Sequence, residues 1–421
     1  MKLIPVNYLP VLKSKNFVRL WISHILSQVS TYTLLFIIIS RTFDLTTSTI
    51  ATGMVWISFT LPTVLLSPFS GSLVDIWNKR KTLTITYLIH AFIILLFAVA
   101  FFFNKYQLVH PLIFFYALIA IINDPAELAE IPQIIKKKKN LMSANSIIFF
   151  TDQASFILSS AIAGILLRFI PLTGVILIMA IMPLGASFST YFLPKGDKKE
   201  RKMRSLSIEI EDFLVRVKLG YKFIRSQKLI LYGFSLIIFF RVFLTISILL
   251  LPSLSKNVLG ISVYDAGYTV ILPIAFGLAL GTLILNKTQK KRKKEWIGSG
   301  MTLLGINFIL FLTIVPGNMI IRRIVGIILS VILGACASVV YAPAQTFIHE
   351  FTPANLRGRT FSSLIFFTTI VSIPSILMVT TLAEIFGTKY FLISIGLAIS
   401  LLGILIIKKG NEIILATNNR T

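Results

Sequence analysis

The chain has 421 residues, of which 56% are apolar and only 14% are charged. Soluble globular proteins carry about 25% charged residues, so this composition and the mean hydropathy of +0.86 exclude a soluble multidomain enzyme and a disordered or fibrous chain. The formal net charge is +25, which in a soluble protein would suggest nucleic-acid binding. The single cysteine, Cys336, excludes an intrachain disulfide and a cysteine metal site.

Apolar runs long enough to cross a membrane recur along the chain. A spanning helix needs roughly 20 mostly apolar residues, and in hydrocarbon its backbone polar groups must be satisfied within the helix. The sequence therefore predicts an all-α membrane protein with twelve transmembrane helices. The first six runs fall near 17–40, 49–73, 82–103, 109–131, 143–168 and 172–193. The second six fall near 228–252, 266–285, 297–315, 320–345, 360–385 and 388–407.

Positive charges are concentrated in alternate segments between these runs. Cytoplasmic loops of membrane proteins are enriched in Lys and Arg, so we expect both termini to be cytoplasmic, in a bacterial inner membrane. The basic loops then face anionic lipid headgroups rather than nucleic acid. The segments expected outside hold few of the 41 basic residues: Arg41, Lys105, Arg168, Lys256, Arg322, Arg323 and Lys389.

The longest polar stretch separates the sixth run from the seventh. The sequence predicts an N-terminal six-helix half at 1–195, a cytoplasmic linker at 196–227 and a C-terminal six-helix half at 228–421. Apolar residues of 208–214 recur at helical spacing, which predicts a helix on the membrane surface. Duplicated six-helix halves around a central site are the architecture of many secondary transporters.

The loop after the second run carries a motif. It reads Gly71-Ser72-Leu73-Val74-Asp75-Ile76-Trp77-Asn78-Lys79-Arg80-Lys81. This resembles the signature of the major facilitator superfamily in that loop: a glycine, an aspartate four positions on, and a basic cluster. Ile76 stands where a basic residue is common, and Asn78 where glycine is common. The resemblance implies the major facilitator fold. We expect a conformational latch formed by Gly71, Asp75, Lys79, Arg80 and, at the cytoplasmic end of the fourth run, Glu130.

Further stretches resemble the bacterial branch that contains enterobactin exporters and macrolide efflux pumps. The resemblance covers roughly 17–407 and implies a proton-driven exporter whose fifth and eighth spans pack across the interface between halves. Related exporters often carry an aspartate after the Ser-Gln pair of the first span, where this chain reads Ser27-Gln28-Val29-Ser30-Thr31. The matching stretches are Asn16-Phe17-Val18-Arg19-Leu20-Trp21, Asn123-Asp124-Pro125-Ala126, Gly220-Tyr221-Lys222-Phe223-Ile224 and Pro353-Ala354-Asn355-Leu356-Arg357-Gly358-Arg359.

Ionisable residues inside a span are costly and are therefore candidates for function. Arg241 lies near mid-depth of the seventh run, where its guanidinium suits an anionic group of the substrate or a carboxylate of the protein. Asp124, Glu127 and Glu130 follow at i, i+3 and i+6 in the fourth run, so they share one broad face. Asp124, Glu127 and Asp152 are the candidates for proton coupling, and structural ion pairing is the alternative for each.

Two polar faces complete the candidate substrate cavity. His24 and Gln28 lie in the first run, and Ser338 and Tyr341 in the tenth. In the superfamily that the chain resembles, spans one, four, seven and ten line the cavity. His24 can titrate near neutrality or can hydrogen-bond across a helix pair. The sequence has no phosphate loop, zinc pattern or Gly-x-Ser-x-Gly elbow, so we expect no enzyme activity, metal or cofactor.

These features together predict a monomeric, proton-coupled exporter of a small amphipathic compound such as a drug, macrolide or siderophore. The 34 phenylalanines suit a bulky, partly apolar ligand. A lysophospholipid-type flippase is one alternative, because related lysophospholipid transporters share the Pro-Ala and Ala-Asn pairs around the loop after the fourth span and Arg241 could hold a phosphate. A membrane receptor or scaffold is the other, although it has no reason to keep Arg241, Asp124 and Asp152 in hydrocarbon.

Overall fold

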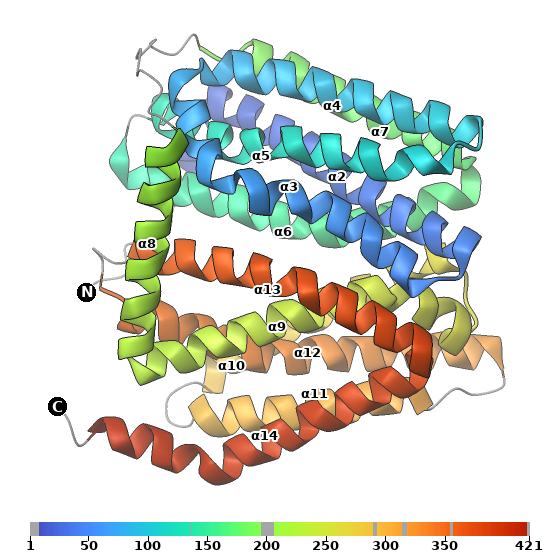
Figure 1. The fold of residues 1–421 in the computed structure, drawn as a ribbon, viewed down its shortest axis with the longest axis vertical. Coiled ribbons are helices and arrows are strands. Elements are labelled where there is room, and N and C mark those ends of the chain that lie inside the picture. Colours follow the sequence, from blue (N-terminus) through green and yellow to red (C-terminus); the bar gives the residue numbers. More distant parts are fainter. Residues whose placement is uncertain are drawn as a thin grey trace. The chain divides into compact units, whose positions relative to one another are not determined.

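The computed structural model describes residues 8–135, 137–194, 206–288, 293–313, 318–353 and 357–418. Within these ranges, twelve helical segments are long and apolar enough to cross a membrane, which confirms the predicted all-α membrane fold (Figure 1). The helices of the first part are α1 (Leu9–Leu12), α2 (Lys15–Thr46), α3 (Thr49–Ile76), α4 (Lys79–Phe102), η1 (Tyr106–Leu108), α5 (Val109–Ile134), α6 (Lys138–Phe169) and α7 (Leu172–Tyr191). Those of the second part are α8 (Leu206–Ser226), α9 (Lys228–Ser253), η2 (Leu254–Leu259), η3 (Val263–Asp265), η4 (Gly267–Ile271), α10 (Leu272–Thr288), α11 (Lys293–Thr313), α12 (Met319–Phe351), α13 (Arg357–Phe386) and α14 (Thr388–Asn418).

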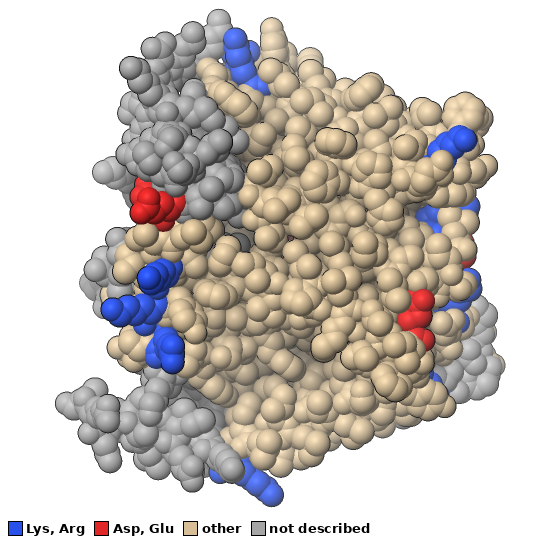
Figure 2. Space-filling model, viewed as in Figure 1, with Lys and Arg blue, Asp and Glu red and all other residues tan. Residues whose placement is uncertain are grey.

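Charged side chains on the visible face lie toward the ends of the helices. Figure 2 shows a broad band of uncharged residues between them. Large apolar side chains such as Phe92, Phe150 and Phe188 are exposed. An uncharged band with outward-facing apolar side chains is what a lipid-facing surface requires.

The helices group into two compact units by their contacts. The first unit contains 1–39 and 55–212, and the second contains 40–54 and 213–421. The turn that joins α2 to α3 therefore belongs to the second unit, although both helices lie in the predicted N-terminal half. The boundary at 212 falls inside α8, so most of this linker helix belongs to the second unit.

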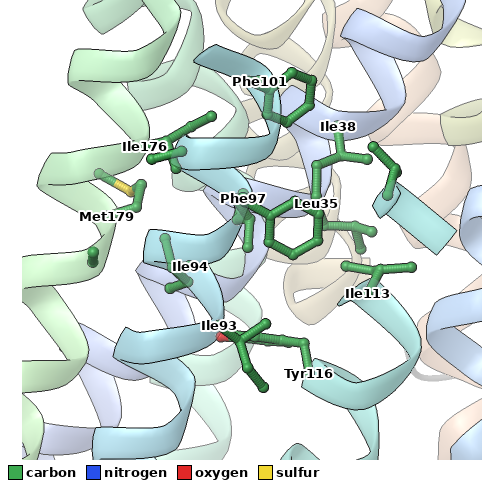
Figure 3. Packing of buried hydrophobic residues seen from close by; sticks show 14 of the residues in the cluster. Leu35, Ile38, Ile93, Ile94, Phe97, Phe101, Ile113, Tyr116, Ile176 and Met179 are labelled. Carbon is green, nitrogen blue, oxygen red and sulfur yellow. The ribbon is translucent and has the colours of Figure 1, made fainter. Parts of the chain in front are cut away.

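The core of the first unit is built mainly from α2, α4, α5 and α7. In Figure 3, the ring of Phe97 of α4 points toward Leu35 of α2 and the side of Ile113 of α5, whereas Ile94 of α4 lies on the side of Met179 of α7. All five side chains are almost fully buried. This packing fixes the backbones of α2, α4 and α5, the three helices that carry the polar site described below.

In the second unit, α10 and α12 touch backbone to backbone. A Cβ atom at Gly277 would meet the carbonyl oxygen of Val331 at 1.9 Å, and one at Gly334 would meet that of Ile274 at 2.0 Å. Gly281 likewise faces α12. Glycines on both helices thus allow the close approach of α10 and α12 within the second unit.

The linker helix α8 packs onto α13. Phe213 lies edge-on to Phe366 at 5.3 Å between ring centroids, and Tyr221 lies 5.2 Å from Phe367. The hydroxyl of Ser363 donates to the carbonyl oxygen of Val217 at 3.1 Å. The apolar residues at helical spacing in α8 therefore cover part of another helix.

Candidate functional site

A group of buried polar side chains lies where α2, α4 and α5 meet. Nδ1 of His24 on α2 lies 2.6 Å from Oε2 of Glu127 on α5. The hydroxyl of Tyr87 on α4 donates to Oε1 of the same carboxylate. All three side chains are buried. Both oxygens of Glu127 thus have protein partners in place of the water that a buried carboxylate loses.

Asp124 and Asp152 form the accessible edge of this group. Asp124 lies one turn before Glu127 on α5 and interacts electrostatically with both Glu127 and Asp152. Asp152 on α6 accepts hydrogen bonds from the hydroxyl of Tyr32 at 3.0 Å and from Nε2 of Gln153 at 2.8 Å. Asp124 is exposed and Asp152 is half-buried, although each lies several turns inside its helix. The first unit therefore leaves part of each of these two carboxylates uncovered within a spanning segment.

Two prolines remove backbone hydrogen bonds from α5 in this region. Pro125 directly follows Asp124, and Pro132 lies two turns later. Proline has no N–H, so the carbonyl group of Ile121 receives no bond from position 125. Such free backbone groups inside a membrane helix are tolerated where they line a polar site. Among the residues that the structure describes, no group of three or more His, Cys, Asp and Glu is arranged to hold a metal ion.

A second buried network lies beside the first and supplies partners for both ring nitrogens of His90. The His90 ring stacks on Tyr116 at 4.2 Å, its Nε2 lies 3.1 Å from the Tyr116 carbonyl oxygen, and its Nδ1 lies 3.4 Å from Nδ2 of Asn123. Thr86 donates to Asn123, and the Tyr116 hydroxyl pairs with Thr31 at 2.6 Å. These contacts join α2, α4 and α5 and give His90 a structural role.

The second unit holds the remaining candidates for the substrate cavity. Tyr341 on α12 packs on Phe240 of α9 with ring centroids 4.9 Å apart, and its hydroxyl accepts a hydrogen bond from Gln345 at 2.7 Å. Ser338 is buried, donates to the carbonyl oxygen of Ala335 and contacts Gly281 of α10. Ser338 thus lies in a helix contact. The side chain of Arg241, on α9, lies outside the described residues.

Twelve apolar spans with ionisable groups held inside them are typical of a membrane transporter. The family model described as Major Facilitator Superfamily matches residues 20–375. The chain belongs to the Major Facilitator Superfamily. It is a multi-pass membrane protein of this transporter family. No curated protein matches the sequence.

Solved structures with the same fold include transporters of several kinds. The nucleoside transporter NupG is 14% identical, with a TM-score of 0.67 over 93% of this chain and 99% of NupG. The peptide transporter POT in complex with sulfate is 14% identical, with a TM-score of 0.68 over 97% and 99%. A bacterial homologue of the iron transporter ferroportin in its inward-facing state is 16% identical, with a TM-score of 0.65 over 93% and 98%. At these identities the likeness shows the fold alone.

The latch expected in this transporter is partly described. Lys79 and Arg80 open α4, where Asn78 caps the helix: its Oδ1 accepts from the backbone N–H of Lys81 at 3.1 Å. Asn78 thus serves as an N-cap with φ of −69° rather than as a left-handed turn residue. The Arg80 guanidinium lies over the Tyr191 ring at 5.0 Å.

Glu130 is buried at the end of the latch region. It lies within electrostatic reach of Lys79. Gly71 and Asp75 are on α3, and the side chain of Asp75 lies outside the described residues. The latch therefore stays a prediction for these positions.

The structure thus places some of the candidate site residues close together and leaves others apart. It brings together His24, Asp124, Glu127 and Asp152, whereas Gln28 is half-buried on α2. Sequence reasoning missed Tyr87 and Tyr32. The available signal was weak, since it is only the general need of a buried tyrosine hydroxyl for a partner.

Proposed function

We propose that this transporter is a proton-coupled exporter of a small amphipathic compound. It works as a monomer by alternating access, in a bacterial inner membrane with both termini in the cytoplasm. The observation that carries the proposal is the imbalance of charge in the first unit. Asp124, Glu127 and Asp152 provide three carboxylates around one histidine, His24.

The carboxylates of this group carry more negative charge than its single histidine can balance. An acidic or basic side chain at the bilayer centre costs about 2.5–3.5 kcal/mol on insertion scales. A single imidazolium ion can balance at most one of the three carboxylates. Protonation of both Asp124 and Asp152 would remove the remaining two charges, and neither side chain is fully covered by protein. Glu127 lies behind them and contacts His24.

Aromatic side chains beside the acidic group suit an amphipathic ligand. Tyr32, which binds Asp152, lies edge-on to Phe156 with centroids 5.0 Å apart. Phe240 and Tyr341 offer a second aromatic pair in the second unit. Rings with a few polar groups are typical of small-molecule sites. The direction of transport, export, is supported by the resemblance to efflux pumps.

Alternating access follows from the two six-helix halves. Residues 1–195 rock against 228–421 while the linker 196–227 tethers them. The latch of Gly71, Asp75, Lys79, Arg80 and Glu130 forms in one of the two states. Arg241 is proposed to meet the substrate in the C-terminal half.

Efflux measurements with a panel of probes test this proposal. Proteoliposomes or everted vesicles are incubated with one of four external probes, and uptake of the probe into the vesicles is measured. The probes are ethidium, labelled erythromycin, a labelled catecholate siderophore and labelled lysophosphatidylethanolamine. We expect the accumulation of one of the first three to stop when a protonophore is added. Asp124→Asn and Glu127→Gln should abolish the accumulation, whereas Glu211→Gln, on the exposed part of α8, should not. Transport of the lysolipid alone, insensitive to the protonophore, would instead support a flippase.

A further inference from the structure

The first turn of α3 is fastened to α13 by a carboxylate. Oε2 of Glu384 accepts hydrogen bonds from the hydroxyls of Ser48 and Thr49, at 2.8 and 3.2 Å, and from the backbone N–H of Ile50 at 3.0 Å. The first N–H groups of a helix have no partner within the helix, and the positive end of the helix dipole attracts an anion. Glu384 therefore caps a helix that is distant in the sequence.

Close packing supports this cap. The Thr49 hydroxyl also lies 2.8 Å from the carbonyl oxygen of Thr380, one turn before Glu384. A Cβ atom at Gly53 would meet Cγ2 of Thr380 at 2.9 Å. Thr49 and Thr380 are buried. The start of α3 thus rests directly on α13, and we call the contacts of Ser48, Thr49, Ile50 and Gly53 with Thr380 and Glu384 the α3 clasp.

The α3 clasp lies in the short segment of the N-terminal helices that belongs to the second unit. Residues 40–54 belong to the second unit, whereas the rest of α2 and most of α3 belong to the first. Movement of the bodies of α2 and α3 away from the second unit must therefore bend these helices or release the clasp. Besides the clasp, Asp44 at the end of α2 pairs with Lys256 of η2 at 3.6 Å, an ion pair of partly exposed side chains that contributes little.

We propose that Glu384 is a positioning residue for transport: its cap ties the α2–α3 turn to α13, and the cap releases during the transport cycle. The inference rests on alternating access, which is part of the proposed function. From the distribution of basic residues, we expect the clasp to lie on the outer side of the membrane.

The chemistry of the clasp suits a contact that forms and breaks. Glu384 is exposed and Ser48 is half-buried, so water can replace the partners that each loses on release. Thr47, in the turn between α2 and α3, has a φ of 53°, which is unfavourable for a β-branched residue. Release of the clasp would allow this residue to relax, which offsets part of the loss of hydrogen bonds.

Cysteine labelling in lipid nanodiscs, where both faces are accessible, tests the proposal. The buried Cys336 is first replaced by alanine. Thr380→Cys then reports on the clasp, because α3 covers this position. Loss of a hydrogen bond to a charged group shifts an equilibrium by about tenfold or more, so Glu384→Ala should speed maleimide labelling at 380 by at least that factor. Glu384→Gln, which keeps an acceptor oxygen, should give a smaller increase.

A matched reporter separates release of the clasp from general loosening. Thr388 is also buried, at the start of α14, but pairs with Ser253 at 2.6 Å rather than with α3. Labelling of Thr388→Cys should not change in Glu384→Ala. Equal acceleration at both positions, or no acceleration at 380, would overturn the proposal.

Disulfide formation gives a second measurement that does not depend on the reporter. A Cβ atom at Gly53 would lie 3.3 Å from that of Thr380, close to the distance that a disulfide requires. Oxidation of Gly53→Cys/Thr380→Cys should slow at least several-fold when Glu384 becomes alanine. The control pair Gly300→Cys/Val339→Cys, with its corresponding atoms 3.1 Å apart, should be unaffected. Unchanged oxidation at 53 and 380 would contradict the clasp. Neither measurement uses protons or substrate, so failure of proton coupling would be seen separately.

Discussion

Glu127 lies at the centre of the polar group in the first unit. Its two oxygens are held by His24 and Tyr87. Asp124, one turn away, is exposed. The two carboxylates thus have different surroundings, and the difference comes from the partners supplied by α2 and α4.

The hydroxyl of Tyr87 is expected to stabilise the fold and to tune the site. Tyr87→Phe leaves one buried oxygen of Glu127 without its donor, which should lower the free energy of unfolding by about 1–3 kcal/mol. Tyr116→Phe is the matched control, because Tyr116 is equally buried but bonds Thr31. Only Tyr87→Phe should change the pH profile of transport, measured in proteoliposomes. Identical profiles for both variants would remove Tyr87 from the site.

The His24–Glu127 pair should show strong energetic coupling. Removal of one partner of a buried ion pair costs about 3–5 kcal/mol, because the other charge is left uncompensated. We expect His24→Gln and Glu127→Gln each to lower the thermal stability of the purified protein. The double variant should be more stable than the sum of the single effects predicts. Additive effects would show that the two side chains do not interact.

At the scale of the helices, the sequence predicted which segments are helical but did not predict which side chains pair between helices. Runs of apolar residues predicted all twelve spans, because a membrane allows few other structures. Helical spacing also predicted that Asp124 and Glu127 share a face. The pairing of Glu127 with Tyr87, and that of Glu384 with Ser48, joins residues far apart in the chain. No periodicity within one helix contains that information.

Helix contacts in the second unit give a prediction about glycine. Gly277→Ala should weaken the contact between α10 and α12 by about 1–3 kcal/mol, because the new methyl group overlaps the Val331 carbonyl oxygen. Gly326→Ala, on α12, meets no atom within 4 Å. It should be neutral, or stabilising by up to about 1 kcal/mol through helix propensity. Thermal unfolding in detergent measures both, and an equal effect at 277 and 326 would contradict this packing.

At the scale of the whole chain, the division into units differs from the division into six-helix halves. The α2–α3 turn belongs to the second unit, and α8 packs on α13. The sequence could not indicate either grouping, because each depends on side chains such as Glu384 and Phe366 that meet across long separations.

Proton-driven movement of substrate is the central claim, and transport under an imposed pH gradient tests it most directly. Proteoliposomes carry the native transporter, Asp124→Asn or Glu127→Gln, with the labelled probe that the native protein moves. We predict that a pH gradient drives the native protein to accumulate the probe against its concentration gradient, and that neither variant does so. Equal, gradient-independent movement of the probe by all three proteins would contradict the account.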